Sequence, residues 1–394
     1  MSISDLKHAL RKYEFPQSAR EALIKIEQIL AGRNAPSPKQ LDGVMEIISE
    51  FIFCETDRRG GRRSGSLNPL QELQLIDVIC EYLSGSINET AKNTIFLSLF
   101  GGIESQRRLK ILSILASMAM SACSTPMLLA VGVWLQQMGC SSPQSLQLVE
   151  NIIRDHFHLT SNPKSLKWLP TSAPQFVANF ITTITELYVR EVNGNIKMPP
   201  KNLLEIITSW VYGTPTLCLS ALLPAALPSG AIPMAAVSPV AGLISWCALA
   251  PLYIQEGRYH ELKRMSKQNS VKIRKSSANS NTGIIKNDSL NNGYFQVGVL
   301  LCLRAGKTAV VNAQHLLGIL PPVHQAAHQL LSKGVSLATH AQLQECLDRL
   351  GQSVQVALAS GCIYGNLSNL FSSLNSLPEN RLLRIIIKTH QQTI

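Results

Sequence analysis

The segment at 67–83, LNPLQELQLIDVICEYL, carries a complete set of signals for the start of a helix. The side-chain oxygen of Asn68 can accept from the first turn, where backbone N–H groups have no partner within the helix. Pro69 stands where a helix loses no hydrogen bond, and Gln71 falls at the position from which its side chain reaches back to the cap. The sequence therefore predicts a helix over 69–84.

The apolar residues of this segment recur at helical spacing and predict which face is buried. The stripe consists of Leu73, Ile76, Cys80 and Leu83, and Leu75 and Ile79 widen it. We expect Glu72 and Glu81 to face water. The breadth of the apolar surface predicts a helix that neighbours cover on two sides.

Similar segments fill most of the chain, whereas alternating β-branched runs between tight turns are nearly absent. Further helices are predicted at 4–31 with a break near Pro16, and at 39–54, 87–100, 105–122, 126–138, 143–157, 163–169, 173–190, 200–212, 293–320, 322–338, 340–360, 366–374 and 379–389. Repeated helix pairs with short polar connections indicate an all-α fold, an irregular α-solenoid or HEAT-like array. No strict repeat period is present.

The segment at 256–292 is rich in Ser, Asn, Lys and Arg and poor in large apolar residues. Such a composition cannot offset the entropy lost on ordering and predicts a long disordered linker. We therefore expect an N-terminal helical array at 1–255, a basic flexible linker at 256–292, and a C-terminal helical segment at 293–394 that packs on the same array.

Only 15% of the residues are charged, against about a quarter in an average soluble domain. The chain therefore has few charges with which to cover its surface, and exposed apolar area usually marks a contact site. This composition predicts a surface that partner proteins cover.

The net charge of +11 is concentrated in two segments and does not spread over the helices. Arg58, Arg59, Arg62 and Arg63 lie together in a Gly-rich loop, and 255–292 holds eight Lys or Arg against three Asp or Glu. The arginine loop either contacts RNA or an acidic partner, or is a plain charged loop. The second segment either carries a nuclear-import signal or is kept soluble by its charge. The residues of that signal would be Lys263, Arg264, Lys272, Arg274 and Lys275.

Fifty residues from Ile206 to Gln255 contain no Asp, Glu, Lys or Arg. Prolines divide this stretch into pieces shorter than the ~20 residues that a membrane span needs. We expect short buried helices joined by Pro turns, with Trp210 and Trp246 in the core.

The nine cysteines form no CxxC pair and mostly lie in apolar helical runs, which is typical of buried thiols.

Three short motifs resemble reactive sites, and none has the residues that its chemistry requires. AGKT at 305–308 lacks the glycine that a phosphate-binding loop needs at Leu301. HQAAH at 324–328 has the histidine spacing of a zinc protease, but Gln325 replaces the acid that would activate water. In DHFH at 155–158 the two histidines diverge on a helix. The sequence predicts no catalytic residue, no cofactor and no metal site.

Five collinear segments resemble the family of Integrator complex subunit fifteen. They are LNPLQELQLIDVICEYL at 67–83, SAPQFVANFITTITELY at 172–188, MPPKNLLEIITSWV at 198–211, SPVAGLISWCALAPL at 238–252 and LDRLGQSVQVALASG at 347–361. The resemblance implies an all-helical scaffold subunit of a nuclear assembly that cleaves nascent RNA made by RNA polymerase II. It also implies partners among the Integrator subunits numbered ten, thirteen and fourteen, with the endonuclease on another subunit. Vertebrate members carry a Pro- and His-rich tail, whose function is not carried over to this chain.

The residues and the resemblance together favour a nuclear, non-enzymatic scaffold that binds other subunits through apolar helical faces. It would meet RNA only indirectly, and neither a membrane nor a small-molecule substrate. The alternative is an RNA-binding adaptor that acts through the two basic segments, since such binding rests on phosphate contacts from Lys and Arg.

Overall fold

The structure is a computed structural model, and its fold is all-α, as the sequence predicts. It describes residues 3–30, 37–56, 67–85, 88–101, 106–158, 163–189, 191–192, 195–228, 231, 237–253, 293–306 and 310–391. The chain packs into two compact units. The first unit consists of Met1–His156 and Pro224–Ala235, and the second of Phe157–Leu223 and Ala236–Ile394.

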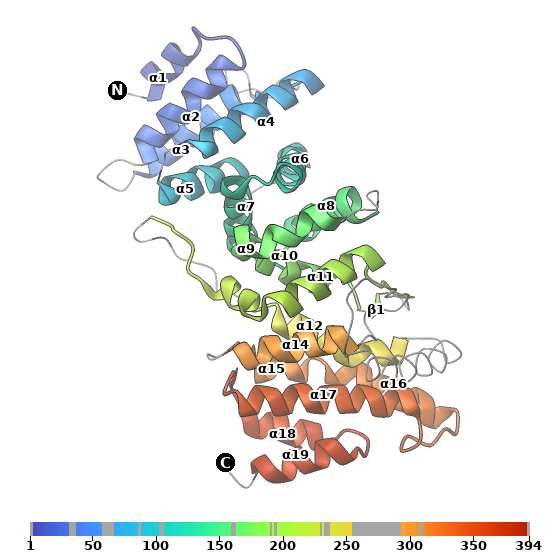
Figure 1. The fold of residues 1–394 in the computed structure, drawn as a ribbon. Coiled ribbons are helices and arrows are strands. Elements are labelled where there is room, and N and C mark those ends of the chain that lie inside the picture. The colour runs from blue at the N-terminus through green and yellow to red at the C-terminus, as the bar shows by residue number, and fades with distance from the viewer. Residues whose placement is uncertain are drawn as a thin grey trace, which may run out of the picture. The chain divides into compact units, whose positions relative to one another are not determined.

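The first unit is built from helices that pack against helices close to them in the chain order (Figure 1). These are α1 (Ile3–Leu10), α2 (Gln17–Leu30), α3 (Pro38–Ile47), the π-helical turn η1 (Ile48–Ile52), α4 (Pro69–Ser84), α5 (Glu89–Phe100), α6 (Gln106–Ala122), α7 (Thr125–Met138) and α8 (Pro143–Ile153). Helix α2 packs against α3, α4 and α5, and α6 packs against α4, α7 and α8. The π-helical turn η2 (Arg154–His158) leads into the second unit.

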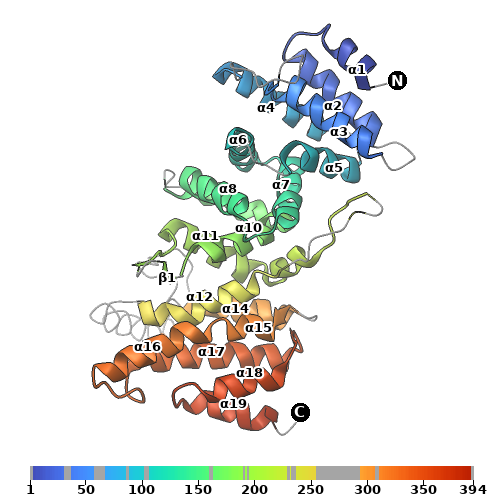
Figure 2. The same ribbon diagram turned by 180° about the vertical axis from the view of Figure 1, so that it is seen from behind.

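The second unit has a long helix, α17, with helices on both of its sides (Figure 2). Its helical elements are η3 (Pro163–Trp168), α9 (Leu169–Ser172), α10 (Pro174–Leu187), α11 (Lys201–Gly213), η4 (Pro215–Leu222), α12 (Val240–Leu249), η5 (Ala250–Tyr253), α14 (Gly293–Ala305), α15 (Ala313–Leu317), α16 (Leu320–Ser332), α17 (Ala341–Ala359), α18 (Leu367–Asn375) and α19 (Arg381–Gln391). Helices α12, α14, α16 and α19 all pack against α17.

Strands are limited, within the described residues, to two pairs of two-residue segments. β1 (Glu191–Val192) and β2 (Asn195–Ile196) are antiparallel, whereas β3 (Val311–Asn312) and β4 (Ile363–Tyr364) are parallel. These pairs tie loops together and form no layer of their own.

Helices α10 and α12 approach each other so closely that only glycine fits at position 242. A Cβ added to Gly242 would overlap the side chain of Thr185 on α10. The hydroxyl of Thr185 donates to the backbone carbonyl of Thr182 at 2.7 Å, so the polar group does not remain unsatisfied in the helix contact.

The uncharged stretch forms short buried elements, as expected, in the parts that the structure describes. Trp210 and Trp246 are fully buried, and their indole N–H groups donate to the carbonyls of Leu166 and Tyr188 at 3.0 and 3.1 Å. The two hydrogen bonds satisfy the polar atom of each tryptophan inside the core.

Several element predictions need correction. The helix predicted over 39–54 continues from Ile47 as the π-helical turn η1, the one over 163–169 is the 3₁₀-helix η3 as far as Trp168, and the one over 322–338 ends at Ser332. The helix predicted over 293–320 is interrupted: α14 ends at Ala305, and β3 and α15 follow it. Val310 and Val311 donate from their backbone N–H groups to the carbonyl of Cys362, so tertiary pairing replaces the helix there. The helix predicted over 143–157 keeps its α-geometry only to Ile153 and continues as the π-helical turn η2.

The predicted division into 1–255, 256–292 and 293–394 stays a prediction, because 256–292 lies outside the described residues. Helices α12 and α14, on either side of that segment, pack against each other within the second unit.

Candidate interaction surfaces

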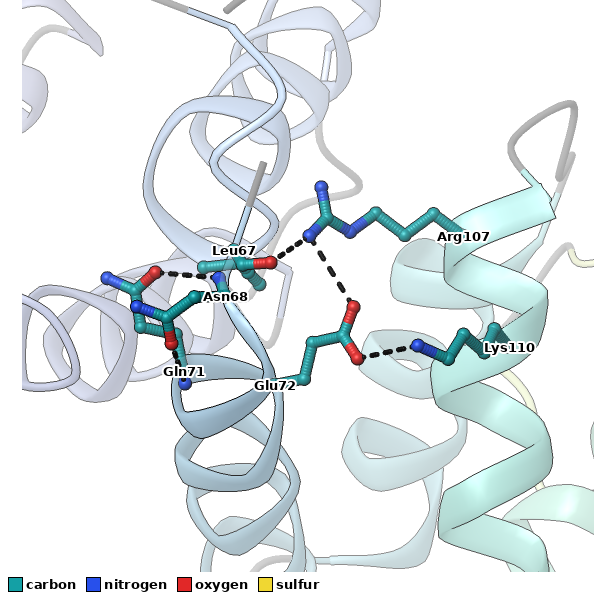
Figure 3. A network of polar contacts seen from close by, with 6 residues as sticks. All are labelled: Leu67, Asn68, Gln71, Glu72, Arg107 and Lys110. Carbon is teal, nitrogen blue, oxygen red and sulfur yellow. Dashed lines mark hydrogen bonds and ion pairs between the residues drawn. The ribbon is translucent and has the colours of Figure 1, made fainter. Parts of the chain in front are cut away.

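The start of α4 is held by a reciprocal cap, which Figure 3 shows. The Oδ1 atom of Asn68 accepts from the backbone N–H of Gln71 at 2.9 Å, and the Oε1 atom of Gln71 accepts from the backbone N–H of Asn68 at 3.0 Å. Both bonds satisfy donors that a helix start leaves open. The first turn of α4 is therefore held rigidly by its cap.

Glu72 joins this turn to α6. Its carboxylate lies 2.9 Å from Nζ of Lys110 and 3.5 Å from Nη2 of Arg107, and the Arg107 guanidinium also donates to the carbonyl of Leu67 (Figure 3). Glu72 is only 9% exposed. The expectation that Glu72 faces water is wrong, because the cations of α6 lie opposite it and compensate its burial.

The rotation of α4 that buries Glu72 turns two leucines outward. Leu70 and Leu73 are 64% and 53% exposed, whereas Leu75, Ile76 and Ile79 are fully buried. Leu73 therefore does not belong to the buried stripe in which the sequence placed it. We call Leu70 and Leu73 the α4 surface: two apolar side chains, one helical turn apart, on a rigid turn.

A second exposed apolar surface lies in the second unit, where α11 packs against α14. The rings of Tyr212 and Tyr294 meet edge to face, with centroids 6.2 Å apart and planes at 70°. Val297 follows Tyr294 on the same face of α14, and all three side chains are exposed. We call these three residues the aromatic surface.

Comparison with known proteins shows the family of this chain. The family model described as Integrator complex subunit 15 matches residues 4–379. The chain belongs to the Integrator complex subunit 15 family. The family member from Drosophila melanogaster is 35% identical, and the match covers 100% of both chains. The members from Homo sapiens and Danio rerio are each 28% identical over 98% of this chain, with 87% and 81% of their own lengths covered.

The five segments that carry the resemblance to the Integrator complex subunit 15 family lie on α4, α10, α11, α12 and α17. They therefore belong to both units, and one of them contains the capped first turn of α4, which carries Leu70 and Leu73. These segments supply helices that pack in both units, and none of them contains a cluster of reactive side chains.

The residues predicted for binding or import cannot be placed in this family member. Arg58, Arg59, Arg62 and Arg63 lie outside the described residues, as do Lys263, Arg264, Lys272, Arg274 and Lys275. Their roles stay predictions.

One histidine of each motif, His156 and His324, lies close to a polar group of the protein. Nε2 of His156 lies 3.2 Å from the carbonyl of Ser117, and burial lowers the pKa of His156. The hydroxyl of Ser117 donates to Asp155 at 2.8 Å. On α16, Nε2 of His324 lies 3.5 Å from the hydroxyl of Ser376. Among the described residues, no group of three or more His, Cys, Asp or Glu could hold a metal ion.

The AGKT motif begins at the end of a helix and not at the start of one. Gly306 donates from its backbone N–H to the carbonyls of Cys302 and Leu303, so it closes the last turn of α14. A phosphate-binding loop instead precedes a helix, whose N-terminal N–H groups bind the anion.

In the part of the chain that the structure describes, no helix is long and apolar enough to span a membrane.

Sequence reasoning missed the Glu72 contact and, with it, the α4 surface. A signal was present: α6 begins QRRLK, which places Arg107, Arg108 and Lys110 within one turn. Because charged side chains are rarely buried unless they are paired, cations beside a broad apolar face indicate carboxylates on neighbouring elements. Glu55 and Glu72 are those carboxylates.

Asn68→Ala is expected to destabilise the first unit by about 1 kcal/mol, because the N–H of Gln71 loses its acceptor at the helix start. Urea unfolding followed by circular dichroism measures the change. Asn68→Asp is the control, since an aspartate accepts the same bond and its charge suits a helix N-terminus. Equal stability of the alanine variant and the wild type would contradict the capping role.

Proposed function

We propose that this chain is a non-catalytic scaffold subunit of the Integrator complex and that it binds other subunits through its exposed helical faces in the nucleus. In this role it supports the cleavage of nascent RNA polymerase II transcripts, in small nuclear RNA 3′-end processing and in transcription attenuation. The α4 surface is the observation that carries the proposal. Leu70 and Leu73 project from a turn that a cap and two ion pairs hold in place.

The physical argument rests on preorganisation. A leucine that is more than half exposed costs free energy in water, and the cost is recovered when a partner covers the side chain. Because the turn beneath both leucines is already ordered, binding there would lose little further conformational entropy. The partners that we propose are the subunits numbered ten, thirteen and fourteen, and RNA would be met only through them.

The double variant Leu70→Ser, Leu73→Ser is expected to lower the recovery of Integrator subunits with the tagged chain at least about tenfold. Such a loss corresponds to about 1.4 kcal/mol, which is less than the burial of two leucines can supply. Affinity purification from nuclear extract, with and without nuclease, followed by mass spectrometry measures the recovery.

Two control variants make this result specific. Leu331→Ser alters another exposed leucine, 56% exposed on α16, and should leave recovery unchanged. A chain lacking 256–292 should also retain its partners. Full recovery with the double variant would exclude the α4 surface. Absence of Integrator subunits from the wild-type sample, or their loss on nuclease treatment, would overturn the scaffold function and favour the RNA-binding adaptor.

A further inference from the structure

Helix α19 presents three cations around one exposed apolar side chain. Arg381, Arg384 and Lys388 recur at spacings of three and four residues, so they share one face of the helix. Ile385 lies among them and is 53% exposed, whereas Leu383, Ile386 and Ile387 are buried on the other side. A helix that needed only to anchor itself to α17 would not require an isoleucine on its outer face.

A hollow of about 440 Å³ opens beside this face, between α19 and the turn that contains Ala338. The side chains of Arg381, Arg384, Ile385 and Lys388 line it together with Gln344 and Glu379. The lining combines positive charge with apolar surface and contains no aromatic ring. We call the hollow and the four α19 side chains the α19 surface.

Hydrogen bonds hold the walls of the hollow in place. Asn380 accepts the backbone N–H of Leu383 at the start of α19, and its Nδ2 donates to Gln344 at 3.1 Å and to Asp348 at 2.8 Å. Nε2 of Gln344 donates to the carbonyls of Leu337 and Glu379 at 3.1 and 3.0 Å. The turn, α17 and the start of α19 are therefore joined through two amide side chains, and the hollow is formed before any partner arrives.

The charges of the α19 surface are incompletely compensated. Nη1 of Arg384 lies 3.0 Å from Oε1 of Glu379, and both side chains are exposed. Within the described residues, neither Arg381 nor Lys388 forms an ion pair with a carboxylate. The surface therefore offers two unpaired cations on either side of Ile385.

We propose that the α19 surface binds an acidic peptide segment of a partner protein, with an apolar side chain of that segment packed against Ile385. Carboxylates would pair with Arg381 and Lys388, in the manner of charge complementarity at protein interfaces. The exposed Ile385 favours a peptide over nucleic acid, since an apolar side chain of a peptide can pack against it. Glu379 is already paired with Arg384, and a single strand of RNA would find no aromatic side chain in the hollow on which to stack its bases.

The proposal rests on the scaffold function and adds the chemistry of one partner. Its test replaces Ile385 with a photo-crosslinking amino acid in the full chain and identifies, by mass spectrometry, the peptide that it captures in cells. The expected capture is a segment in which Asp and Glu outnumber Lys and Arg and which contains a large apolar residue. Adding Arg381→Glu and Lys388→Glu should lower the crosslink yield at least about tenfold, since each reversal replaces an attraction with a repulsion.

Matched controls separate this effect from general changes in charge. Arg154→Glu with Lys201→Glu reverses two exposed cations on other helices and should leave the yield unchanged. Replacing the captured acids with Lys should restore crosslinking to the charge-reversed chain. A captured RNA, a peptide without excess acid, an unchanged yield after charge reversal, or no crosslink at all would each overturn the proposal.

The two proposals fail separately. Loss of the acidic crosslink while Integrator subunits still copurify overturns only the α19 surface. An acidic crosslink in a sample without Integrator subunits overturns only the scaffold function.

Discussion

Trp246→Ala is expected to destabilise the second unit by about 3–5 kcal/mol, because a fully buried indole is removed from the core. Three losses combine in this variant. A large cavity forms, the edge-to-face contact with Tyr188 disappears, and the Tyr188 carbonyl loses the indole N–H that donates to it at 3.1 Å. The rings of Tyr188 and Trp246 have centroids 6.2 Å apart and planes at 82°, a favourable geometry for an aromatic pair.

Native-state hydrogen exchange measures this loss locally. Amides of α10 and α12, which pack against each other, should exchange faster in the variant, and amides of α6 in the first unit provide an internal reference. Trp246→Phe keeps one aromatic ring but loses the N–H donor and part of the ring volume, so its effect should be smaller, about 1–3 kcal/mol. Unchanged protection of α10 and α12 in Trp246→Ala would show that the indole does not support this contact.

Arg108→Ala is expected to destabilise the first unit by about 3 kcal/mol, the lower end of the range for breaking a buried ion pair. The guanidinium is buried and forms two hydrogen bonds with the carboxylate of Glu55, one of them 3.0 Å long from Nε. It also donates to the Ser49 hydroxyl at 3.1 Å and lies over the ring of Phe53, 4.5 Å from its centroid. We choose the lower end because the Glu55 side chain is 23% exposed and can regain water.

The pair allows a double-mutant cycle. Suppose that the buried charges are needed mainly to fix the orientation of η1 against α6, and not for net stability. In that case Arg108→Met with Glu55→Leu should be less destabilised than Arg108→Met alone, because the double variant leaves no carboxylate without its partner. Hydrogen exchange of η1 and α6 amides provides the measurement, with α17 as the internal reference. A double variant at least as unstable as the single one would show that the unpartnered Glu55 carboxylate is not what destabilises Arg108→Met.

The starts of helices could be predicted residue by residue. Asn68 and Gln71 form the cap that their spacing indicates, and α4 spans Pro69–Ser84 as expected. The break near Pro16, between α1 and α2, could be predicted from the sequence in the same way. Capping groups and prolines act on the backbone within about one turn, so the relevant atoms are neighbours in the sequence.

The candidate surfaces could be predicted only in kind. Low charge indicated that apolar side chains would remain exposed, and the structure has them at Leu70, Leu73, Tyr212, Tyr294 and Ile385. Their positions depended on contacts with other elements. The Tyr212–Tyr294 pair joins residues that are 82 positions apart, and the hollow beside α19 needs the turn at Ala338 as its second wall.

The sequence by itself determined that this chain is all-α, where most of its helices begin, and to which family it belongs. Only the tertiary structure decided the rotation of α4, and with it which of its apolar residues are exposed. On α4, apolar residues occupy so many positions that several rotations would bury a similar apolar area, and local spacing cannot choose among them. The choice came from α6, whose Arg107 and Lys110 compensate the buried charge of Glu72 and so turn Leu70 and Leu73 outward.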